Sequence, residues 1–273
     1  MLADAFRAEA MRFLRQRGAI LWGYGFVPAL GLLVAIATAL FVRSHIHQRM
    51  PGAAMVGKSM LDGIQGASAP PVQLFVLLAA AALFAGDYRW ESWRLFTPRN
   101  SRTNLLLGKL GVYAVASLAG VLLLGLSGLL RSVLGAAIDG SSISFPALSG
   151  PFAGQLGLSL LTGWLDLMLL GELALLTAVL TRSNIAAVLV PFALFCVQAF
   201  AVSLLPGPTR VDPPLKYLLA LPSLSVDMLR GTPAPFGEQG ANPLVAAMIV
   251  AGWLAAMLAL ALWLFQRQDL TRE

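Results

Sequence analysis

Charged side chains are scarce in this 273-residue chain. Asp, Glu, Lys and Arg make up 12% of the sequence and hydrophobic residues 58%, whereas soluble domains carry about 25% charge. So few polar residues cannot cover a surface that faces water, and the composition therefore predicts a membrane protein. The net charge is +6, but the basic residues lie between apolar blocks and form no continuous patch, which argues against a nucleic-acid-binding protein.

Cysteine and histidine are almost absent. The one cysteine, Cys196, lies in an apolar run, which excludes a disulfide within the chain and a cysteine-based metal site. The two histidines, His45 and His47, stand together without a third or fourth ligand at close spacing, so the sequence does not favour a metal site there. The N-terminal segment also lacks the apolar core and small-residue cleavage site of a signal peptide, and we expect it to be retained.

One short motif raises the possibility of a nucleotide site. Gly52, Gly57, Lys58 and Ser59 match the phosphate-binding pattern G-x-x-x-x-G-K-S. Such a loop works when it joins a buried strand to a helix, because its backbone N–H groups must surround the phosphates. The stretch before it, RSHIHQRM, is polar and cannot be that strand. We therefore expect a turn rich in Gly and Ala on an extracytoplasmic loop, and no nucleotide site.

The apolar residues gather into six blocks. A bilayer core about 30 Å thick requires about 20 apolar residues per helix. The sequence therefore predicts six transmembrane helices, of which the second is short and has the least defined boundaries. The blocks are approximately Ile20–Val42, Pro71–Ala85, Leu105–Leu130, Phe152–Leu180, Ile185–Leu205 and Pro243–Phe265.

The distribution of Lys and Arg sets the predicted orientation. If the N-terminus lies in the cytoplasm, the inner segments hold 12 of the 19 basic residues. Cytoplasmic loops carry the excess of Lys and Arg in most membrane proteins. We therefore expect an integral protein of the cytoplasmic (inner) membrane with both termini in the cytoplasm.

The first 18 residues have the pattern of an amphipathic helix. Apolar residues recur at helical spacing on one face, and charged residues, Glu9 among them, lie off it. Aromatic residues opposite arginines are typical of a helix that lies in the headgroup plane. The predicted apolar face consists of Leu2, Phe6, Ala10, Phe13 and Leu14.

A charged, aromatic segment, Ala85–Leu110, separates the second and third blocks. Trp90 and Trp93 are three residues apart among alternating charges, which favours a short amphipathic helix that presents its charges to a partner. Pro98 would end this helix, and Ser101 could cap the next one. An interfacial anchor without a partner explains the composition equally well.

This segment resembles the first cytoplasmic loop of type-2 ABC transporter (ABC-2) permeases. Members of that family read approximately G-E-x-x-x-G-T, then a proline, a small residue with Arg, and L-L-x-x-K-L. The matching positions in this chain are Gly86-Asp87, Pro98, Ser101-Arg102 and Leu106–Leu110. Glu91-Ser92 stands where Gly-Thr is usual, and the gap from Pro to Arg is one residue longer.

The resemblance implies an all-α membrane permease. Its N-terminal amphipathic interfacial helix would cover residues 1–18 and its six-helix transmembrane domain residues 19–273. The domain would include a cytoplasmic coupling loop at 86–104 and an extracytoplasmic re-entrant segment, a broken helical hairpin, at 206–240. Residues 213–229, PPLKYLLALPSLSVDML, fit this hairpin because they are apolar, too short to span and broken by Pro222.

The resemblance also implies that ATP binding and membrane transport are carried by different subunits. Two copies of a separate ATP-binding subunit would carry ATP and Mg²⁺, and a second permease, identical or related, would complete a dimeric exporter. The chain itself would bind no cofactor or metal and would not be an enzyme. The residues expected to contact the ATP-binding subunit are Asp87, Arg89, Trp90, Glu91, Trp93, Arg94, Arg99, Arg102 and Lys109.

Asp166 and Glu172 lie within the fourth apolar block. Ionisable residues inside a span are costly and usually face a cavity or a partner. Their spacing places them about 240° apart around a helix, so they do not share a face and are not expected to be a catalytic pair. Either could line a transport pathway, or could form a structural hydrogen bond to a neighbouring helix or a second subunit.

Two other classes of function remain open at this point. An intramembrane enzyme would use Asp166 or Glu172 and would act without any ATPase. A non-transporting membrane assembly factor would bind a partner without ATP dependence. The chemical nature of a transported substrate is not encoded in any motif of the chain.

Overall fold

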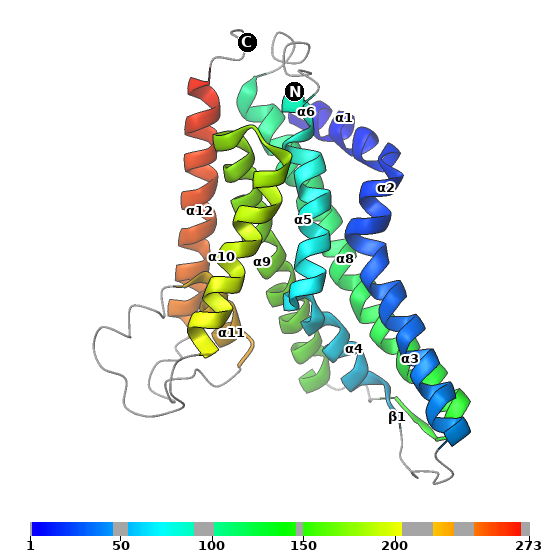
Figure 1. Cartoon of the computed structure of the whole chain (residues 1–273). Helices are drawn as coiled ribbons and strands as arrows, with labels where there is room; N and C mark the ends of the chain where they lie inside the picture. The colour runs from blue at the N-terminus through cyan, green and yellow to red at the C-terminus, as the bar shows by residue number, and fades with distance from the viewer. Residues whose placement is uncertain are drawn as a thin grey trace.

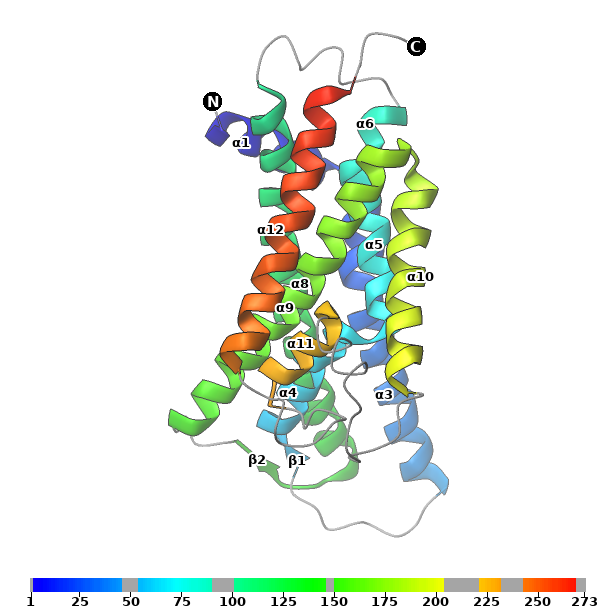
Figure 2. The same ribbon diagram turned by 90° about the vertical axis from the view of Figure 1, so that its left-hand side faces the viewer.

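The computed structural model describes residues 2–45, 54–89, 101–145, 150–203, 221–231 and 243–268. These residues are almost entirely helical, and the long helices run side by side in alternating directions through an elongated bundle (Figure 1). We call one end of the bundle the α1 end, because α1 lies across it; the last turn of α12 lies at the same end (Figure 1). The opposite end, which carries α4 and α11, is the α4 end (Figure 2).

Each predicted apolar block lies in a helix over its described residues, and the largest shift is in the third block, where α8 continues past Leu130 to Asp139. The N-terminal half of the chain contains α1 (Leu2–Arg15), α2 (Arg17–Ile20), a π-helical turn η1 (Leu21–Gly25), α3 (Phe26–His45), α4 (Val56–Gln65), a 3-10 turn η2 (Gly66–Ser68), α5 (Pro70–Phe84) and α6 (Gly86–Arg89). The remaining helices are α8 (Arg102–Asp139), α9 (Gly150–Thr181), α10 (Asn184–Ser203), α11 (Pro222–Leu229) and α12 (Pro243–Arg267).

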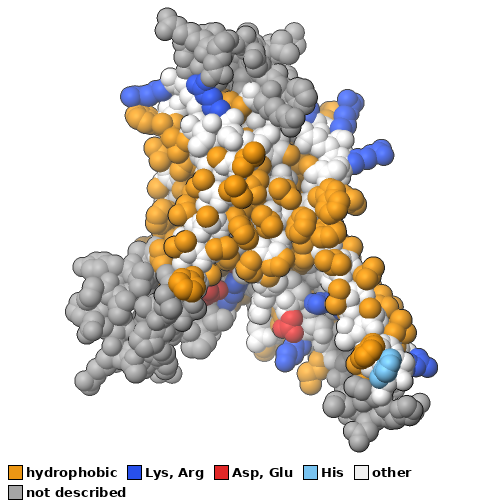
Figure 3. All heavy atoms as spheres, viewed as in Figure 1, with side chains coloured by type: hydrophobic (Ala, Val, Ile, Leu, Met, Phe, Trp, Pro, Cys, Tyr) orange, Lys and Arg blue, Asp and Glu red, His pale blue; other side chains and the backbone are white. Residues whose placement is uncertain are grey.

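Four of the described helical stretches are long and apolar enough to cross a membrane. They are Arg17–His45, Arg102–Asp139, Pro151–Thr181 and Pro243–Arg267. The helices Val56–Ser68 and Pro70–Phe84 form a pair bent by 59°, which is a fifth candidate if it counts as one span, and the apolar helix Asn184–Phe200 is shorter. On the face that Figure 3 shows, hydrophobic side chains form a broad band across the bundle, and charged side chains gather toward its two ends. The chain is therefore an all-α protein of membrane type.

The bend before α5 follows from two consecutive prolines. Ala69 has extended backbone angles, φ −71° and ψ 136°, and Pro70 and Pro71 occupy the first turn of α5. A residue that precedes proline is biased away from helical angles, so α4 cannot continue into α5. The second apolar block was expected at Pro71–Ala85, and α5 confirms it to within one residue at each end.

The motif at Gly57–Ser59 does not form the expected turn. These residues lie in the first turn of α4, and the two-residue strand β1 (Ala54–Met55) falls inside the motif instead of before it. β1 pairs in parallel with β2 (Ile143–Ser144), and Met55 is exposed. The expectation of a turn was wrong because α4 is held as a helix by its contact with α8. Gly52 lies outside the described residues.

A pair of glycines brings α4 and α8 into backbone contact. A Cβ atom at Gly63 would lie 2.5 Å from the carbonyl oxygen of Leu124, and one at Gly128 would collide with the carbonyl oxygen of Ser59. Small residues allow this kind of close crossing in membrane helices. Ala79 and Gly120 also pack within the protomer: Ala79 meets Gly23, and Gly120 meets the ring of Tyr24.

We expect Gly128→Ala to destabilise the protein. The added methyl group would force α4 away from α8, and overpacking of this kind costs about 1–3 kcal/mol. Gly135→Ala in the same helix is the matched control, because nothing lies within 4 Å of a Cβ there. Alanine is favoured over glycine in a helix by about 1 kcal/mol, so the control should be neutral or stabilising. Thermal unfolding in detergent measures the stability of both variants. Equal changes in the unfolding temperature would contradict the close contact between α4 and α8.

Candidate functional site

Four charged side chains from three elements meet at the α1 end, and we call them the α1 cluster. They are Glu9 and Arg12 of α1, Asp87 of α6 and Lys109 of α8. Lys109 Nζ lies 2.7 Å from Asp87 and 3.3 Å from Glu9, while the Arg12 guanidinium lies 2.6 Å from Asp87 and 2.9 Å from Glu9. Each cation therefore contacts both carboxylates, and these four charges balance.

Glu9, Asp87 and Lys109 are buried because α1 packs closely on α8, whereas Arg12 is half-buried at the edge of the cluster. A Cβ at Gly108 would lie 3.2 Å from the backbone of Ala5, so glycine lets the two helices approach at this point. The neighbouring Lys109 is 2% exposed and donates a further hydrogen bond of 2.7 Å to the carbonyl oxygen of Leu83, at the end of α5. One lysine thus joins α8 to the junction between α5 and α6.

The cations of the cluster keep Asp87 ionised. Burial alone would raise the pKa of Asp87, but attraction from Lys109 and hydrogen bonds from Arg12 and Lys109 outweigh it and lower the pKa to about 2. A lowered pKa contributes stability above the ordinary carboxyl pKa and loses it only as the pH falls toward 2. Asp87 therefore stays ionised at every physiological pH.

The position of Asp87 and Lys109 differs from the expectation of a surface contact. Both side chains are 2% exposed and point into the protein, where each compensates the other. We therefore assign them to holding α6 and α8 together instead of touching a partner directly. The other predicted contact residues, Trp90, Glu91, Trp93, Arg94 and Arg99, lie outside the described residues, as does the side chain of Arg89.

The predicted apolar face of the N-terminal helix was only partly right. α1 forms, but it buries Ala5, Glu9 and Phe13, whereas Leu2 and Leu14 are exposed. Glu9 was placed off the apolar face, and its burial is explained by Lys109, which lies beneath it. The signal available in the sequence was the spacing of Ala5, Glu9 and Phe13, each four residues apart and hence on one face.

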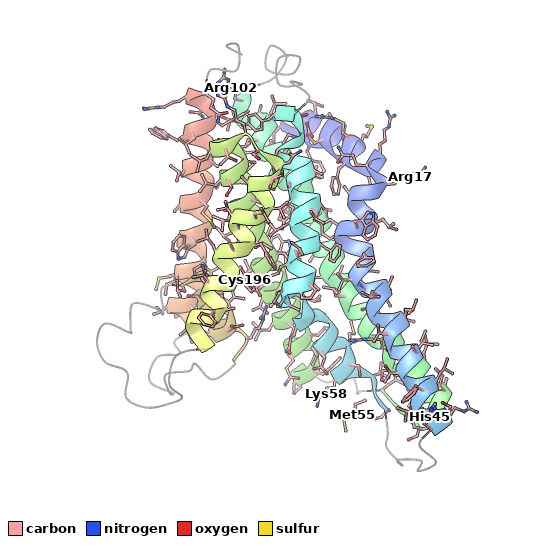
Figure 4. All side chains as sticks on the ribbon, in the orientation of Figure 1. Arg17, His45, Met55, Lys58, Arg102 and Cys196 are labelled. Atoms are coloured by element: carbon pink, nitrogen blue, oxygen red, sulfur yellow. The ribbon has the colours of Figure 1, made fainter. Side chains whose placement is uncertain are left out.

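Arg102 fixes the other boundary of the segment that connects α6 to α8. Its guanidinium donates to the carbonyl oxygens of Phe265, Gln266 and Gln268, at 3.2, 3.2 and 2.6 Å. These carbonyls end α12, where a cation also interacts favourably with the helix dipole. Ser101 accepts a hydrogen bond from the Asn104 backbone N–H at 3.3 Å, which confirms its predicted role as the N-cap of α8. Figure 4 shows Arg102 at the α1 end.

A second polar cluster lies toward the α4 end and joins α9 to α11. The Arg230 guanidinium forms an ion pair with Asp166, and Ser68 of η2 donates to the same carboxylate. Arg230 also contacts Asp227 at 3.0 Å and donates to Thr162 at 3.3 Å. The Asp166 and Arg230 side chains are 7% and 8% exposed. We call Ser68, Thr162, Asp166, Asp227 and Arg230 the α11 cluster.

The α11 cluster borders a small cavity of about 240 Å³. Asp166 and Ser68 line one side, and Ser223 and Asp227 of α11 line the other. Ser223 donates a hydrogen bond of 2.8 Å to Gln198 of α10, so polar contacts attach α11 to two long helices. Within the predicted re-entrant segment, 206–240, the structure describes residues 221–231, where Pro222 begins α11; the rest of the predicted hairpin lies outside the described residues.

Glu172 lies apart from Asp166, as their spacing predicts. Its side chain is buried among α8 and α9 and interacts electrostatically with Tyr113, whose hydroxyl donates to the carbonyl oxygen of Leu167 at 2.6 Å. Among the described residues, Glu172 Oε2 has no hydrogen-bond partner. Asp166 thus has the structural role that the sequence left open, while Glu172 retains a free acceptor atom.

The described residues contain no group of three or more His, Cys, Asp or Glu side chains able to hold a metal ion. His45 stacks on Phe41 at 4.2 Å between ring centroids, and its Nδ1 lies 2.7 Å from Ser44 Oγ. His47 lies outside the described part of the chain. Cys196 is a half-buried free cysteine of α10.

Comparison with known proteins leaves the chain without an assigned family. No family model matches the sequence, and no curated protein matches it significantly.

Proposed function

We propose that this chain is the membrane-spanning permease of an ABC-2 type exporter, driven by a separate ATP-binding subunit. In this proposal α3, the α4–α5 pair, α8, α9, α10 and α12 are the six spans, and α1 lies in the membrane interface. The α1 end faces the cytoplasm. Two permeases and two ATP-binding subunits form the transporter.

The main support is the way the segment 90–100 is anchored on both sides. Before it, Asp87 is fixed by the α1 cluster to α1 and α8. After it, Ser101 caps α8 and Arg102 holds the end of α12. A force applied to this segment from the cytoplasm would therefore reach α1, α8 and α12 together. Rigid coupling of a loop to several helices is what a transporter driven by an external motor requires.

The α11 cluster supports a closed outer end in this state. Asp166 of α9 holds α11 through Arg230, while Ser223 attaches α11 to α10. In an alternating-access cycle, rocking of the helices would separate these partners and open the α4 end. A buried ion pair has two discrete arrangements, made or broken, which suits a switch between two states.

The same contacts argue against an intramembrane enzyme. The Asp166 carboxylate is occupied by Arg230 and Ser68, and Glu172 lies on another side of α9. Tyr113, which lies near Glu172, already donates its hydroxyl to the carbonyl oxygen of Leu167. An assembly factor would share the anchored segment but would need no ATPase, and the experiment below separates it from a transporter.

We expect the tagged chain to co-purify with an ATPase of the phosphate-loop type. Arg94→Glu should reduce that co-purification at least tenfold, because a charge at the docking segment would be reversed. Arg131→Glu is the matched control, since Arg131 lies in the half of α8 near the α4 end. Quantitative mass spectrometry of the purified complexes measures both.

Three outcomes are distinguishable in this experiment. Loss of the ATPase with Arg94→Glu alone supports docking through segment 90–100. Equal recovery from both variants contradicts that docking site. Purification of a homogeneous complex that contains no ATPase, or ATP hydrolysis by the isolated chain, contradicts the transporter proposal as a whole.

A further inference from the structure

An apolar groove of about 350 Å³ opens between α1, the α2–η1 segment and α8. Phe6, Phe13 and Leu14 of α1 form one wall, and Val115 and Ala119 of α8 form the opposite one. Ile20 closes the side formed by α2. Leu14 is 67% exposed and Val115 is 60% exposed, so the groove opens on the outer surface of the bundle and not into its core.

Two arginines lie at the corner between α1 and α2, next to this groove along the chain. Arg15 ends α1 and Arg17 begins α2, between the wall residues Leu14 and Ile20. Both arginines are exposed, and within the described ranges no ion pair engages either of them. Figure 4 shows Arg17 at the corner where α1 turns into α2, on the outside of the bundle. Arg7 lies beside Asp4 and Arg12 belongs to the α1 cluster, so their charges are partly compensated.

We propose that this groove binds one acyl chain of an anionic phospholipid, with its phosphate held by Arg15 and Arg17. The apolar walls would surround the chain, and the two guanidinium groups would pair with the phosphate at the boundary between the apolar band and the charged end. Arginine suits this role because its planar fork donates two parallel hydrogen bonds to phosphate oxygens. The inference needs only a membrane-embedded chain and does not depend on the transport proposal.

The chemistry of the walls favours a lipid over a peptide. An extended peptide brings backbone N–H and C=O groups that must be hydrogen-bonded when buried. Tyr24 carries the only polar side chain that lines the groove among the described residues, and its ring is buried against Gly120. An acyl chain makes no such demand, and a negative headgroup complements the two arginines.

The test uses the full-length protein, delipidated in a neutral detergent. Binding of phosphatidylglycerol and phosphatidylcholine with identical acyl chains is measured by native mass spectrometry. We expect tighter binding of phosphatidylglycerol, and about fivefold weaker binding for each arginine removed by Arg15→Gln or Arg17→Gln. Phosphatidylcholine binding should change little in these two variants, because its phosphate is paired with its own choline.

Filling the groove tests the acyl-chain part of the proposal. Ala119 is exposed in α8, so Ala119→Phe fills the groove without disturbing the core and should weaken binding of both lipids at least fivefold. Ala256→Phe, on the exposed side of α12, is the matched control and should leave binding unchanged. Thermal unfolding without lipid establishes that each variant is folded.

Several results would overturn the proposal. Equal affinity of the unmodified protein for the two lipids would contradict a headgroup site at Arg15 and Arg17. Unchanged binding in Ala119→Phe would place the acyl chain elsewhere. A lipid-free dimer that dissociates in Ala119→Phe would show that a second copy occupies the groove. None of these results bears on whether an ATPase docks at segment 90–100, so the two proposals fail independently.

Discussion

Lys109→Met should destabilise the protein more than any other single change at the α1 end. The substitution leaves Asp87 and Glu9 buried with only Arg12 to compensate them, because Lys109 contacts both carboxylates. Removing one partner of a buried ion pair costs about 3–5 kcal/mol. The carbonyl oxygen of Leu83 also loses its donor. We expect a fall of roughly 10 °C in the unfolding temperature in detergent, measured by tryptophan fluorescence.

A second substitution separates charge imbalance from lost packing. Adding Glu9→Gln to Lys109→Met restores equal numbers of positive and negative charges, so the double variant should be more stable than Lys109→Met alone. Contacting residues commonly couple by about 0.5–3 kcal/mol in such a cycle. Lys58→Met is the control, because Lys58 is exposed on α4 and surface changes cost less than about 0.5 kcal/mol. Additive effects of the two substitutions would contradict an ion-pair cluster.

Arg230→Gln should release α11 from α9. The Arg230 side chain is 8% exposed and engages Asp166, Asp227 and Thr162, so its removal leaves a buried carboxylate without its cation. We expect this substitution to lower the stability of the protein by about 3–5 kcal/mol, mainly by weakening the attachment of α11 to α9. The release of α11 can be measured with a thiol introduced by Leu224→Cys in a Cys196→Ser background. Leu224 is 3% exposed, so a thiol there reacts only when α11 leaves the bundle. Labelling by a polar maleimide should be at least tenfold faster once Arg230 is replaced.

Two further variants make this result specific. Arg230→Lys keeps the charge but loses the forked geometry, so its labelling rate should be intermediate. Asp166→Asn combined with Arg230→Gln removes the uncompensated charge and should restore much of the protection. Arg131→Gln in α8 should have no effect. If the thiol stays protected in Arg230→Gln, the remaining contacts of α11 with its neighbouring helices are enough to hold it in place.

Local patterns were enough to predict the helices. Apolar blocks, prolines and capping residues act over a few positions, which is why Pro70, Ser101 and Pro243 begin helices close to the expected places. The local error at Gly57–Ser59 arose because α4 depends on a long-range crossing with Gly128. The sequence around the motif contains no sign of that contact.

The two charge clusters could not be predicted in the same way. Glu9 and Lys109 are 100 residues apart, and Asp166 and Arg230 are 64 apart. Every buried carboxylate needs a cation, and the sequence does not specify which cation pairs with which carboxylate. The sequence did mark Asp87, Lys109 and Asp166 as unusual, but it could not distinguish an internal partner from an external one.

The contact between Arg102 and the end of α12 bears on the order in which the chain assembles. Arg102 and Phe265 are 163 residues apart. During synthesis the arginine therefore emerges long before its acceptors exist, and must remain in the headgroup layer until the final helix has been inserted. The contact between α8 and the end of α12 therefore forms only after the last helix has been synthesised. A ribosome stalled before Phe265 would leave a nascent chain whose first helices are inserted but in which Arg102 has no contact with α12.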